Sequence, residues 1–400
     1  MHLQRLAPWL LVIAIGLIYL LFPTRVYYWD GITFAQTIEN VPGLQPSLVH
    51  PNHLIYNFVG YIFFKLLRSF SPEIRALTAL QLLNILLSAI CARIFFAILL
   101  DTLRSLYLAV CLTLLFAFSA TWWKFSTDAD AYIPSVLFLL IGFYLVLPGK
   151  KARPLLLAVM FFVSMAFHQL AIVSWPVLAL GIYVQDGELS IKRRLLNAAY
   201  FSAVAAVLIT GAYALLFYLA SDAFSIQRLL SWTASYSPDA DTQFNLWSNL
   251  RYSLRGLVRL FLGGRFNLLK ALVNPLVIFL FAVLMTALGF VLFNVMRTLA
   301  IRILVGRVPK LRLETRQKTV LLLALLWTFL YVVFLFFWLP QNTFYRLFYL
   351  PALILLFGLL IAAAPNRNPK RPTLAAFVIA VAVANFLFLI YPFSKYVGPP

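Results

Sequence analysis

The chain has 400 residues, of which 63% are hydrophobic and only 11% are charged, and its mean hydropathy is +0.93. A water-soluble fold of this length needs far less apolar material, so these values exclude the soluble class and indicate a membrane protein with several spans. The formal net charge of +20 would suggest nucleic acid in a soluble protein. In a membrane protein the positive-inside rule explains it, and we expect no nucleic-acid partner.

The apolar residues fall into twelve segments that alternate with more polar loops. Because backbone groups in lipid need internal hydrogen-bond partners, we expect every segment to be helical. In chain order the segments cover residues 7–22, 54–67, 76–100, 105–122, 132–147, 154–167, 170–184, 195–219, 267–296, 319–339, 347–364 and 373–392. The sequence therefore predicts an all-α, polytopic membrane protein.

Four basic loops orient these segments, because the positive-inside rule places such loops in the cytoplasm. They cover residues 150–153, 192–194, 297–318 and 367–371. Neighbouring cytoplasmic loops must be separated by an even number of crossings. Residues 154–184 are therefore expected to form a hairpin of two short helices that turns near His168 and Gln169, and residues 220–265 are expected outside.

Segment 54–67 permits two topologies. If it spans the membrane, the N-terminus lies outside. If residues 52–69 instead lie in the membrane surface, the N-terminus is cytoplasmic and the loop 24–52 is outside. Polar side chains recur at helical spacing, at His53, Asn57, Tyr61, Lys65 and Arg68. So long a polar stripe favours the surface helix.

With this choice we predict about eleven transmembrane helices, interfacial juxtamembrane helices in the first outer loop, a cytoplasmic N-terminus and an inner- or plasma-membrane location. No soluble domain is expected. Carboxylates close to a bilayer are costly and mark functional sites. The candidate site residues, all on the predicted exoplasmic face, are Asp30, His50, His53, Asp128, Asp130, Tyr132, His168, Tyr345 and Arg346.

Several of these residues occur in short motifs. The motifs are Asp30-Gly31, His50-Pro51-Asn52, Trp123 followed by Asp130-Ala131-Tyr132, and Arg346-Leu347-Phe348 before Pro351. Together they resemble the GT-C superfamily of membrane glycosyltransferases, and within it the branch similar to the protein O-mannosyltransferases. The resemblance covers about residues 1–185, with Asn52 where the branch has a second proline. It implies a GT-C-type catalytic membrane module over residues 1–220 and a variable C-terminal membrane module over residues 221–400.

The resemblance implies a glycosyltransferase that moves a monosaccharide from a polyprenyl-phosphate-linked donor to a lipid, glycan or protein acceptor on the exoplasmic face. Transfer needs a base, and the Asp30 carboxylate suits that role. It also needs a cation beside the departing phosphate, which the Arg346 guanidinium could supply. The remaining candidates for substrate binding are His50, His53, Asp128, Asp130, Tyr132, His168 and Tyr345.

The residues leave alternatives open. Asp128 and Asp130 could bind a divalent cation through oxygen ligands, orient sugar hydroxyls, solvate a loop, or cap the helix that begins near Tyr132. Asp30 could cap a short helix over residues 31–40. Arg346 could anchor the chain to phospholipid headgroups. The same role is expected for a basic amphipathic patch, which consists of Arg251, Arg255, Arg259 and Arg265.

Two other functions compete with sugar transfer. A lipid-linked-sugar transporter or flippase would be expected to show inverted repeats and acidic residues within its spans, and the sequence shows neither clearly. A non-catalytic subunit with the same fold would retain the motifs and lack the reaction.

Overall fold

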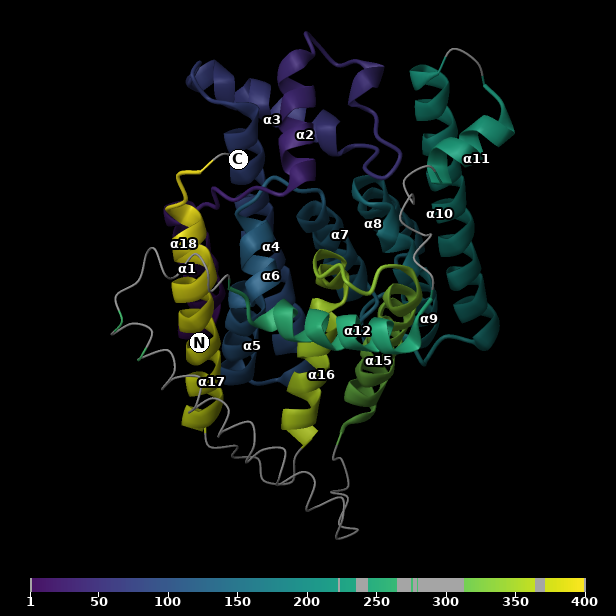
Figure 1. Cartoon of the computed structure of the whole chain (residues 1–400). Helices are drawn as coiled ribbons and strands as arrows, with labels where there is room; N and C mark the ends of the chain where they lie inside the picture. Colours follow the sequence, from purple (N-terminus) through teal and green to yellow (C-terminus); the bar gives the residue numbers. More distant parts are fainter. Residues whose placement is uncertain are drawn as a thin grey trace.

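The computed structural model describes residues 2–221, 224–234, 244–264, 313–363 and 371–398, together with the isolated positions 275 and 279. All regular secondary structure within these ranges is helical (Figure 1), as the apolar segments predict. The predicted segment 267–296, most of the basic run 297–318 and the loop 367–370 lie outside the described residues.

The first part of the chain places a group of short helices beside one long helix. Its elements are α1 (His2–Leu21), α2 (Trp29–Asn40), η1 (Pro46–Leu48), α3 (Tyr56–Phe70), α4 (Ala76–Leu103), α5 (Leu106–Phe118) and α6 (Ala120–Ser126). The predicted segment 105–122 is bent, because Ser119 leaves the helical conformation and α5 and α6 meet at 66°.

The middle of the chain contains the predicted hairpin. Its elements are α7 (Tyr132–Leu145), α8 (Pro154–Phe167), η2 (Gln169–Ser174), α9 (Trp175–Val184) and α10 (Ile191–Ala220). The turn falls where the sequence places it: α8 ends at Phe167, and the ring Nδ1 of His168 accepts a hydrogen bond of 3.0 Å from the backbone N–H of Leu170.

The last part of the chain includes a helix that crosses the long ones. Its elements are α11 (Ile226–Ala234), α12 (Leu246–Phe261), α15 (Thr315–Trp338), η4 (Phe344–Phe348), α16 (Leu350–Ala363), α17 (Arg371–Asn385), η5 (Phe386–Ile390) and α18 (Tyr391–Ser394). Figure 1 shows α12 lying across α15, which it contacts. Arg251, Arg255 and Arg259 of α12 are exposed, whereas Arg265 lies outside the described residues.

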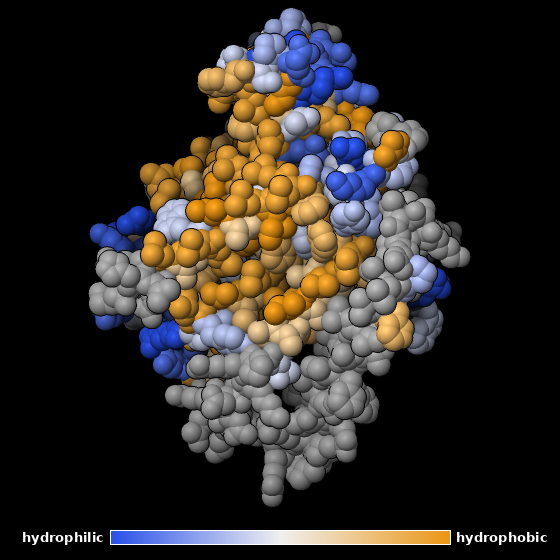
Figure 2. All heavy atoms as spheres, turned by 90° about the vertical axis from the view of Figure 1, so that its left-hand side faces the viewer, coloured by the Kyte–Doolittle hydropathy of each residue, from blue (hydrophilic) through white to orange (hydrophobic). Residues whose placement is uncertain are grey.

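The described residues have the composition of a helical membrane protein. Four helical runs are long and apolar enough to cross a membrane, namely α4, α10, α15 and residues 373–394, and the bent pair α5–α6 would make a fifth. Figure 2 shows a broad hydrophobic surface below a hydrophilic cluster at the top of the view, with smaller hydrophilic clusters at its left and right edges. Shorter apolar helices surround these runs, and the total of eleven spans and their orientation stay predictions.

α4 is the helix against which the N-terminal elements pack. It contacts α1, α2, α3, α5 and α7, and most of its residues are buried, Leu80 and Phe95 among them, whereas Leu86 and Ile90 on one face are exposed. In Figure 1, α2 and α3 lie above the upper end of this group of helices. The segment 24–55 and the start of α4 therefore form one end of the molecule, which carries most of the predicted site residues.

The polar stripe predicted along residues 52–69 does not face water at its first half. His53, Asn57 and Tyr61 are buried, and the Asn57 amide donates a hydrogen bond of 3.2 Å to the carbonyl of Leu48. On the opposite face, Ile62 is 57% exposed. The stripe is polar there because it packs on the loop 42–55, a partner that helical spacing alone does not reveal.

A pair of serines links α7 to α8. The Ser135 hydroxyl donates to the carbonyl of Ser164, and the Ser164 hydroxyl donates to the carbonyl of Ser135, each over 2.8 Å. Both side chains are fully buried. In an apolar surrounding each such interhelical bond contributes about 1 kcal/mol, because an unpaired hydroxyl there is costly.

We expect Ser164→Ala to lower the free energy of unfolding by about 1 kcal/mol, because the Ser135 carbonyl loses its donor. Thr210→Ala is the matched control, since the exposed Thr210 hydroxyl bonds only within its own helix, to the carbonyls of Ala206 and Val207. Denaturing-detergent titration of both variants measures the difference. Equal midpoints for the two variants would contradict this role for the serine pair.

Candidate functional site

Two amide side chains of α4 fix the loop 127–131, which carries the acidic pair. Gln81 Nε2 donates to the carbonyls of Thr24 and Thr127, each over 2.8 Å. Asn84 Nδ2 donates to the carbonyls of Asp128 and Asp130, also over 2.8 Å. Because the two amides are three residues apart, they lie on one face of α4. We call them the amide clamp.

The sequence analysis missed the amide clamp. Its signal was present, because Gln81 and Asn84 are amides at i and i+3 within the otherwise apolar segment 76–100. A buried amide needs hydrogen-bond partners, and the unpaired carbonyls of a neighbouring loop are suitable ones.

Gly31 allows α2 to rest directly on the loop 127–131. A Cβ atom at this position would overlap the carbonyl oxygen of Ala129. The Asp30-Gly31 motif therefore has a steric meaning: the missing side chain brings the first turn of α2, with Asp30, against the backbone that carries Asp128 and Asp130.

Asp128 is a fully buried anchor for the start of α2. Its carboxylate pairs with Lys124 and accepts the backbone N–H of Tyr28 over 3.0 Å and that of Ala129 over 2.8 Å. The loop-solvating role is thus wrong for Asp128. The capping role is also wrong for both acids, because Ala131 is the N-cap of α7 and no side chain caps that helix.

Asp130 is fully buried too, and neither carboxyl oxygen has a hydrogen-bond partner in the described part of the chain. Burial, followed by the negative charges of Asp30 and Asp128, raises the pKa of the Asp130 carboxyl well above its ordinary value. The neutral, protonated form is therefore favoured, since a buried carboxylate without partners is costly.

Asp30 lies within the first turn of α2 and lines a cavity. The N-cap of α2 is Tyr28, and no side chain makes a capping bond there, so the capping interpretation of Asp30 is wrong. Burial and then the charge of Asp128 raise the pKa of Asp30 above its ordinary value. A raised pKa makes the ionised Asp30 a stronger base than a carboxylate in water.

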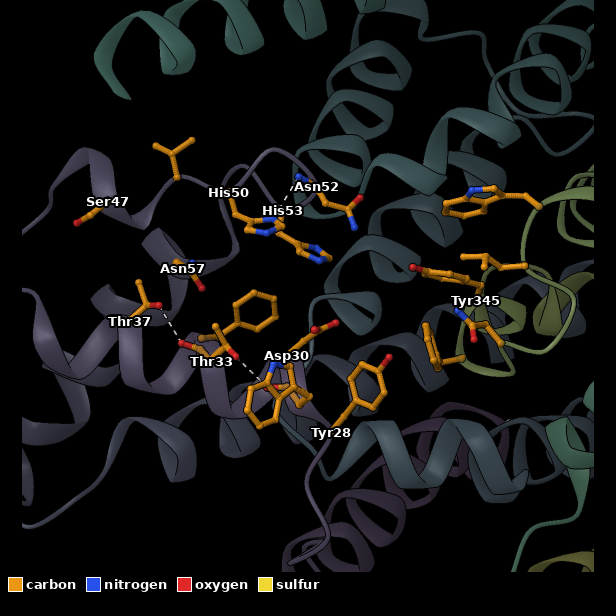
Figure 3. Close-up of a pocket in the computed structure, with 17 residues that line it drawn as sticks. Tyr28, Asp30, Thr33, Thr37, Ser47, His50, Asn52, His53, Asn57 and Tyr345 are labelled. Atoms are coloured by element: carbon orange, nitrogen blue, oxygen red, sulfur yellow. Dashed lines mark hydrogen bonds between the residues drawn. The ribbon is translucent and has the colours of Figure 1, made fainter. Parts of the chain in front are cut away.

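The cavity has a volume of about 300 Å³ and lies between α2, the loop 47–53 and residues 338–345. Figure 3 shows the Asp30 carboxylate and the hydroxyls of Tyr28 and Tyr345 directed into it, with His50 and His53 above. The wall combines aromatic rings with groups that hydrogen-bond. Its other polar residues are Thr33, Thr37, Ser47, Asn52, Asn57 and Asn342.

Three histidines form a contiguous cluster beside the cavity. The rings of His50 and His53 stack with centroids 5.3 Å apart, and His53 meets His168 edge to face at 4.7 Å. His168 in turn contacts Tyr132 at 4.9 Å and Tyr345 at 5.7 Å. The cluster thus joins α7 and the turn after α8 to the cavity wall.

All three imidazoles are favoured in the neutral form. Burial lowers the pKa of His50 to about 4. Burial, together with His50, lowers the pKa of His53 to about 3. For His168, burial and the two neighbouring histidines take the pKa well below its usual range.

Backbone partners assign the ring protons. The Nδ1 atoms of His50 and His168 accept backbone N–H groups, of Asn52 at 3.2 Å and Leu170 at 3.0 Å, so their protons are on Nε2. His53 Nδ1 lies 3.1 Å from the carbonyl of Phe167 and must donate to it, which leaves its Nε2 as an acceptor. The cluster therefore combines N–H donors with an imidazole nitrogen that can accept a hydrogen bond.

Arg346 lies behind the cavity wall, not in it. Its guanidinium donates to the Tyr349 hydroxyl and to the Pro340 carbonyl, each over 2.8 Å, and Nε has no partner in the described part of the chain. Gly256 of α12 covers it so closely that a Cβ there would overlap the guanidinium. With 2% of its surface exposed, Arg346 cannot be the headgroup anchor that the sequence also allowed.

The predicted site residues lie in three different places relative to the cavity. Asp30, His50, His53 and Tyr345 line the cavity. Tyr132 and His168 pack behind the histidine and aromatic wall, and Tyr132 stacks on Phe344 at 5.3 Å. The buried residues Asp128, Asp130 and Arg346 do not line the cavity.

The acidic pair is poorly arranged for a divalent cation. Lys124 already pairs with Asp128. Among the described residues, no group of three or more His, Cys, Asp or Glu side chains is placed to hold a metal ion. Hard cations prefer several oxygen ligands, so the donor set present does not fit one.

We expect Gly31→Ala to lower the free energy of unfolding by roughly 1–3 kcal/mol, because the new Cβ must push α2 away from the Ala129 carbonyl. Gly43→Ala, in the loop after α2, is the control, since nothing lies within 4 Å of a Cβ at that position. Thermal unfolding in detergent compares the variants. Equal losses would show that α2 does not depend on this close approach.

Low pH should destabilise the protein through His53. Its folded-state pKa lies below the unfolded value of 6.5, so its contribution is present above pH 6.5 and is lost as the pH falls toward 3. Between pH 6.5 and 4 we expect the wild type to lose on the order of 3 kcal/mol more than His53→Gln. Unfolding measured at several pH values tests this, because the carboxylates are the same in both proteins. Parallel pH profiles would contradict it.

Comparison with known proteins gives a match among the solved structures. No family model matches the chain, and no curated protein matches it. The structure resembles the crystal structure of the oligosaccharyltransferase of Archaeoglobus fulgidus, determined in complex with Zn and sulfate. The TM-score is 0.53 at 16% identity, over 98% of this chain and 53% of that one, so the chain spans about half the length of the enzyme. At this identity the likeness shows the fold alone: the helices of this chain are arranged similarly to part of that oligosaccharyltransferase.

Proposed function

We propose that this protein is a GT-C-type glycosyltransferase that moves a monosaccharide from a polyprenyl-phosphate carrier to a hydroxyl group of a lipid, glycan or protein acceptor. The reaction takes place in the cavity beside Asp30, on the exoplasmic face. The observation that carries the proposal is a partly desolvated carboxylate in the wall of a cavity, within a fold similar to that of an oligosaccharyltransferase.

The cavity wall suits a single sugar ring. Its aromatic residues Tyr28, Trp29, Trp338 and Tyr345 offer apolar faces, and its threonine, asparagine and histidine side chains offer hydrogen bonds to hydroxyls. The volume of about 300 Å³ lies at the small end of the range for small-molecule sites. This size supports transfer of a monosaccharide more than transfer of an oligosaccharide.

Asp30 is the proposed base. As the acceptor oxygen forms its bond to the anomeric carbon, Asp30 takes the hydroxyl proton. The bond between that carbon and the phosphate oxygen breaks, and polyprenyl phosphate leaves with the electron pair. The nearby charge of Asp128 favours protonation of Asp30, which supports the uptake of the proton.

The leaving phosphate needs positive charge or hydrogen-bond donors. Arg346 follows the lining residue Tyr345 directly, and it is buried without a carboxylate partner among the described residues. A charge in such a low-dielectric position acts over a longer distance than in water. We propose that Arg346 stabilises the departing phosphate through this field and positions Tyr345, while the Nε2–H group of His50 donates directly.

The likeness of the motifs to the O-mannosyltransferase branch supports a polyprenyl-phosphate donor that carries one sugar. In this proposal the Asp-Gly element places the base, and the His-Pro element places the histidines over the cavity. The close approach of Gly31 to Ala129 and the hydrogen bond of His50 to the backbone of Asn52 give each element a local physical role.

Asp30→Asn should lower sugar transfer by about 10²- to 10⁴-fold, because the amide cannot take the acceptor proton. Asp30→Glu should retain part of the activity. In the assay, purified protein receives a panel of synthetic polyprenyl-phosphate monosaccharides, each with a radiolabelled sugar, and a membrane extract serves as the acceptor. The polyprenyl phosphate that is released is measured.

Glu188→Gln is the matched control, because it removes an exposed carboxylate far from α2 in the sequence. Wild-type rates for Asp30→Asn would exclude Asp30 as the base. Transfer of the intact labelled lipid between leaflets, without release of polyprenyl phosphate, would identify a flippase instead. Neither release nor lipid movement with any donor of the panel would favour a non-catalytic subunit.

A further inference from the structure

A second cavity lies near the opposite end of α4 from the amide clamp. Its volume is about 630 Å³, and residues of α1, α4 and α7 form its wall, among them Trp9, Arg93 and Tyr144. Because α4 rises about 1.5 Å per residue, the lining residue Arg104 is about 30 Å from Asn84. This cavity is therefore separate from the site beside Asp30, and nothing in the proposed reaction uses it.

Arg93 is the unusual residue of this cavity. It lies within the apolar helix α4, and within the described part of the chain it has no hydrogen bond or ion pair. Its Nε atom is buried without a partner, and the guanidinium carbon is 5.3 Å from the centroid of the Trp9 ring. An uncompensated cation within an apolar span is costly, so an anionic partner from outside the chain would lower its energy.

The acidic residues around the cavity are already engaged. Asp101 bonds to Arg316 over 2.6 Å and pairs with Lys150 over 3.4 Å. Glu314 pairs with Arg104 over 3.1 Å. The charged residues that line the cavity are thus Arg93, Arg104 and Asp101, and Arg93 is the one of the three without an ion-pair partner among the described residues.

The other residues of the wall suit the headgroup region of a lipid. Phe96, Ala97 and Leu100 give it an apolar side. Trp9 is 56% exposed at its edge, as aromatic residues at the level of lipid headgroups are. Toward the membrane interior from Arg93, the apolar side chains of Ile90 and Leu86 are exposed on the same face of α4, where the acyl chains of a lipid held by its phosphate at Arg93 would run.

We propose that this cavity binds the headgroup of an anionic phospholipid, with Arg93 on the phosphate and the acyl chains running inward from it over the exposed side chains of Ile90 and Leu86 of α4. The lipid comes from the leaflet on which Asp101 and Arg104 lie, which the charge distribution of the sequence predicts to be the cytoplasmic one. The bound lipid joins α1 to α4. The inference does not depend on the sugar-transfer reaction.

The test counts lipids retained by the purified full-length chain. The protein is reconstituted in phosphatidylcholine nanodiscs with and without phosphatidylglycerol, and native mass spectrometry then measures the bound lipid. We expect the wild type to retain one phosphatidylglycerol and no phosphatidylcholine. Arg93→Gln should retain about tenfold less, because it loses a charge-assisted contact.

Arg153→Gln is the matched control, since it removes the same charge from an exposed loop on the same predicted side. Equal retention by Arg93→Gln and Arg153→Gln would overturn the proposal. Competition by inorganic phosphate distinguishes the two sources of phosphate. Displacement of the lipid by free phosphate would show an anion site and overturn the assignment to a lipid.

A second measurement keeps the proposal testable if Arg93→Gln does not fold. The fluorescence of Trp9 is obtained as the difference between the wild type and Trp9→Phe. Brominated phosphatidylglycerol should quench this fluorescence at a lower mole fraction than brominated phosphatidylcholine does. Equal quenching by the two lipids would contradict a headgroup-selective cavity.

Discussion

The candidate site depends on one close contact, the approach of α2 to the backbone of the loop 127–131. Gly31 permits the contact, and the amide clamp of Gln81 and Asn84 holds the loop in place. Asp128 adds a bond to the backbone of Tyr28. The Asp30 and Asp130 carboxyl groups, which are 100 residues apart in the chain, consequently share one end of the molecule. After burial, the charge of Asp30 contributes to the raised pKa of Asp130, and the charge of Asp128 contributes to the raised pKa of Asp30. Without this contact the cavity would lose its acidic wall.

The sequence predicted helices well, because the length of an apolar run limits where a helix begins and ends. The turn at His168 and the start of α7 at Tyr132 followed from such runs. Two features could not follow from them. The 66° bend depends on a single non-helical residue, Ser119. The burial of His53 and Asn57 depends on the loop that packs against them, and a polar stripe has the same spacing whether it faces water or protein.

The sequence indicated which candidate residues lie close together, but not what each of them contacts. Asp30, His50, His53 and Tyr345 line one cavity, and a chain-order argument about which loops share a face is enough to group them. Whether a carboxylate faces the cavity or a backbone amide depends on distances of a few ångströms. The Asp128 carboxylate pairs with Lys124 and accepts two backbone N–H groups, and the Arg346 guanidinium donates to the Tyr349 hydroxyl and the Pro340 carbonyl. Such local partners carry no signal in a single sequence.

The electrostatics of the two ends of α4 follow the same physical rule. A buried charge must be neutralised, paired or supplied with an external partner. Asp130 is favoured as the neutral acid, and Asp128 is paired with Lys124. Arg93, which is half-buried and whose Nε atom is fully buried, has neither solution, because an arginine does not lose its proton and no carboxylate of the described residues pairs with it. The remaining solution is an external partner, and for this reason we propose an anionic lipid for the cavity beside Arg93. The cavity beside Asp30, in contrast, is proposed to bind neutral sugar hydroxyls and to take up a proton.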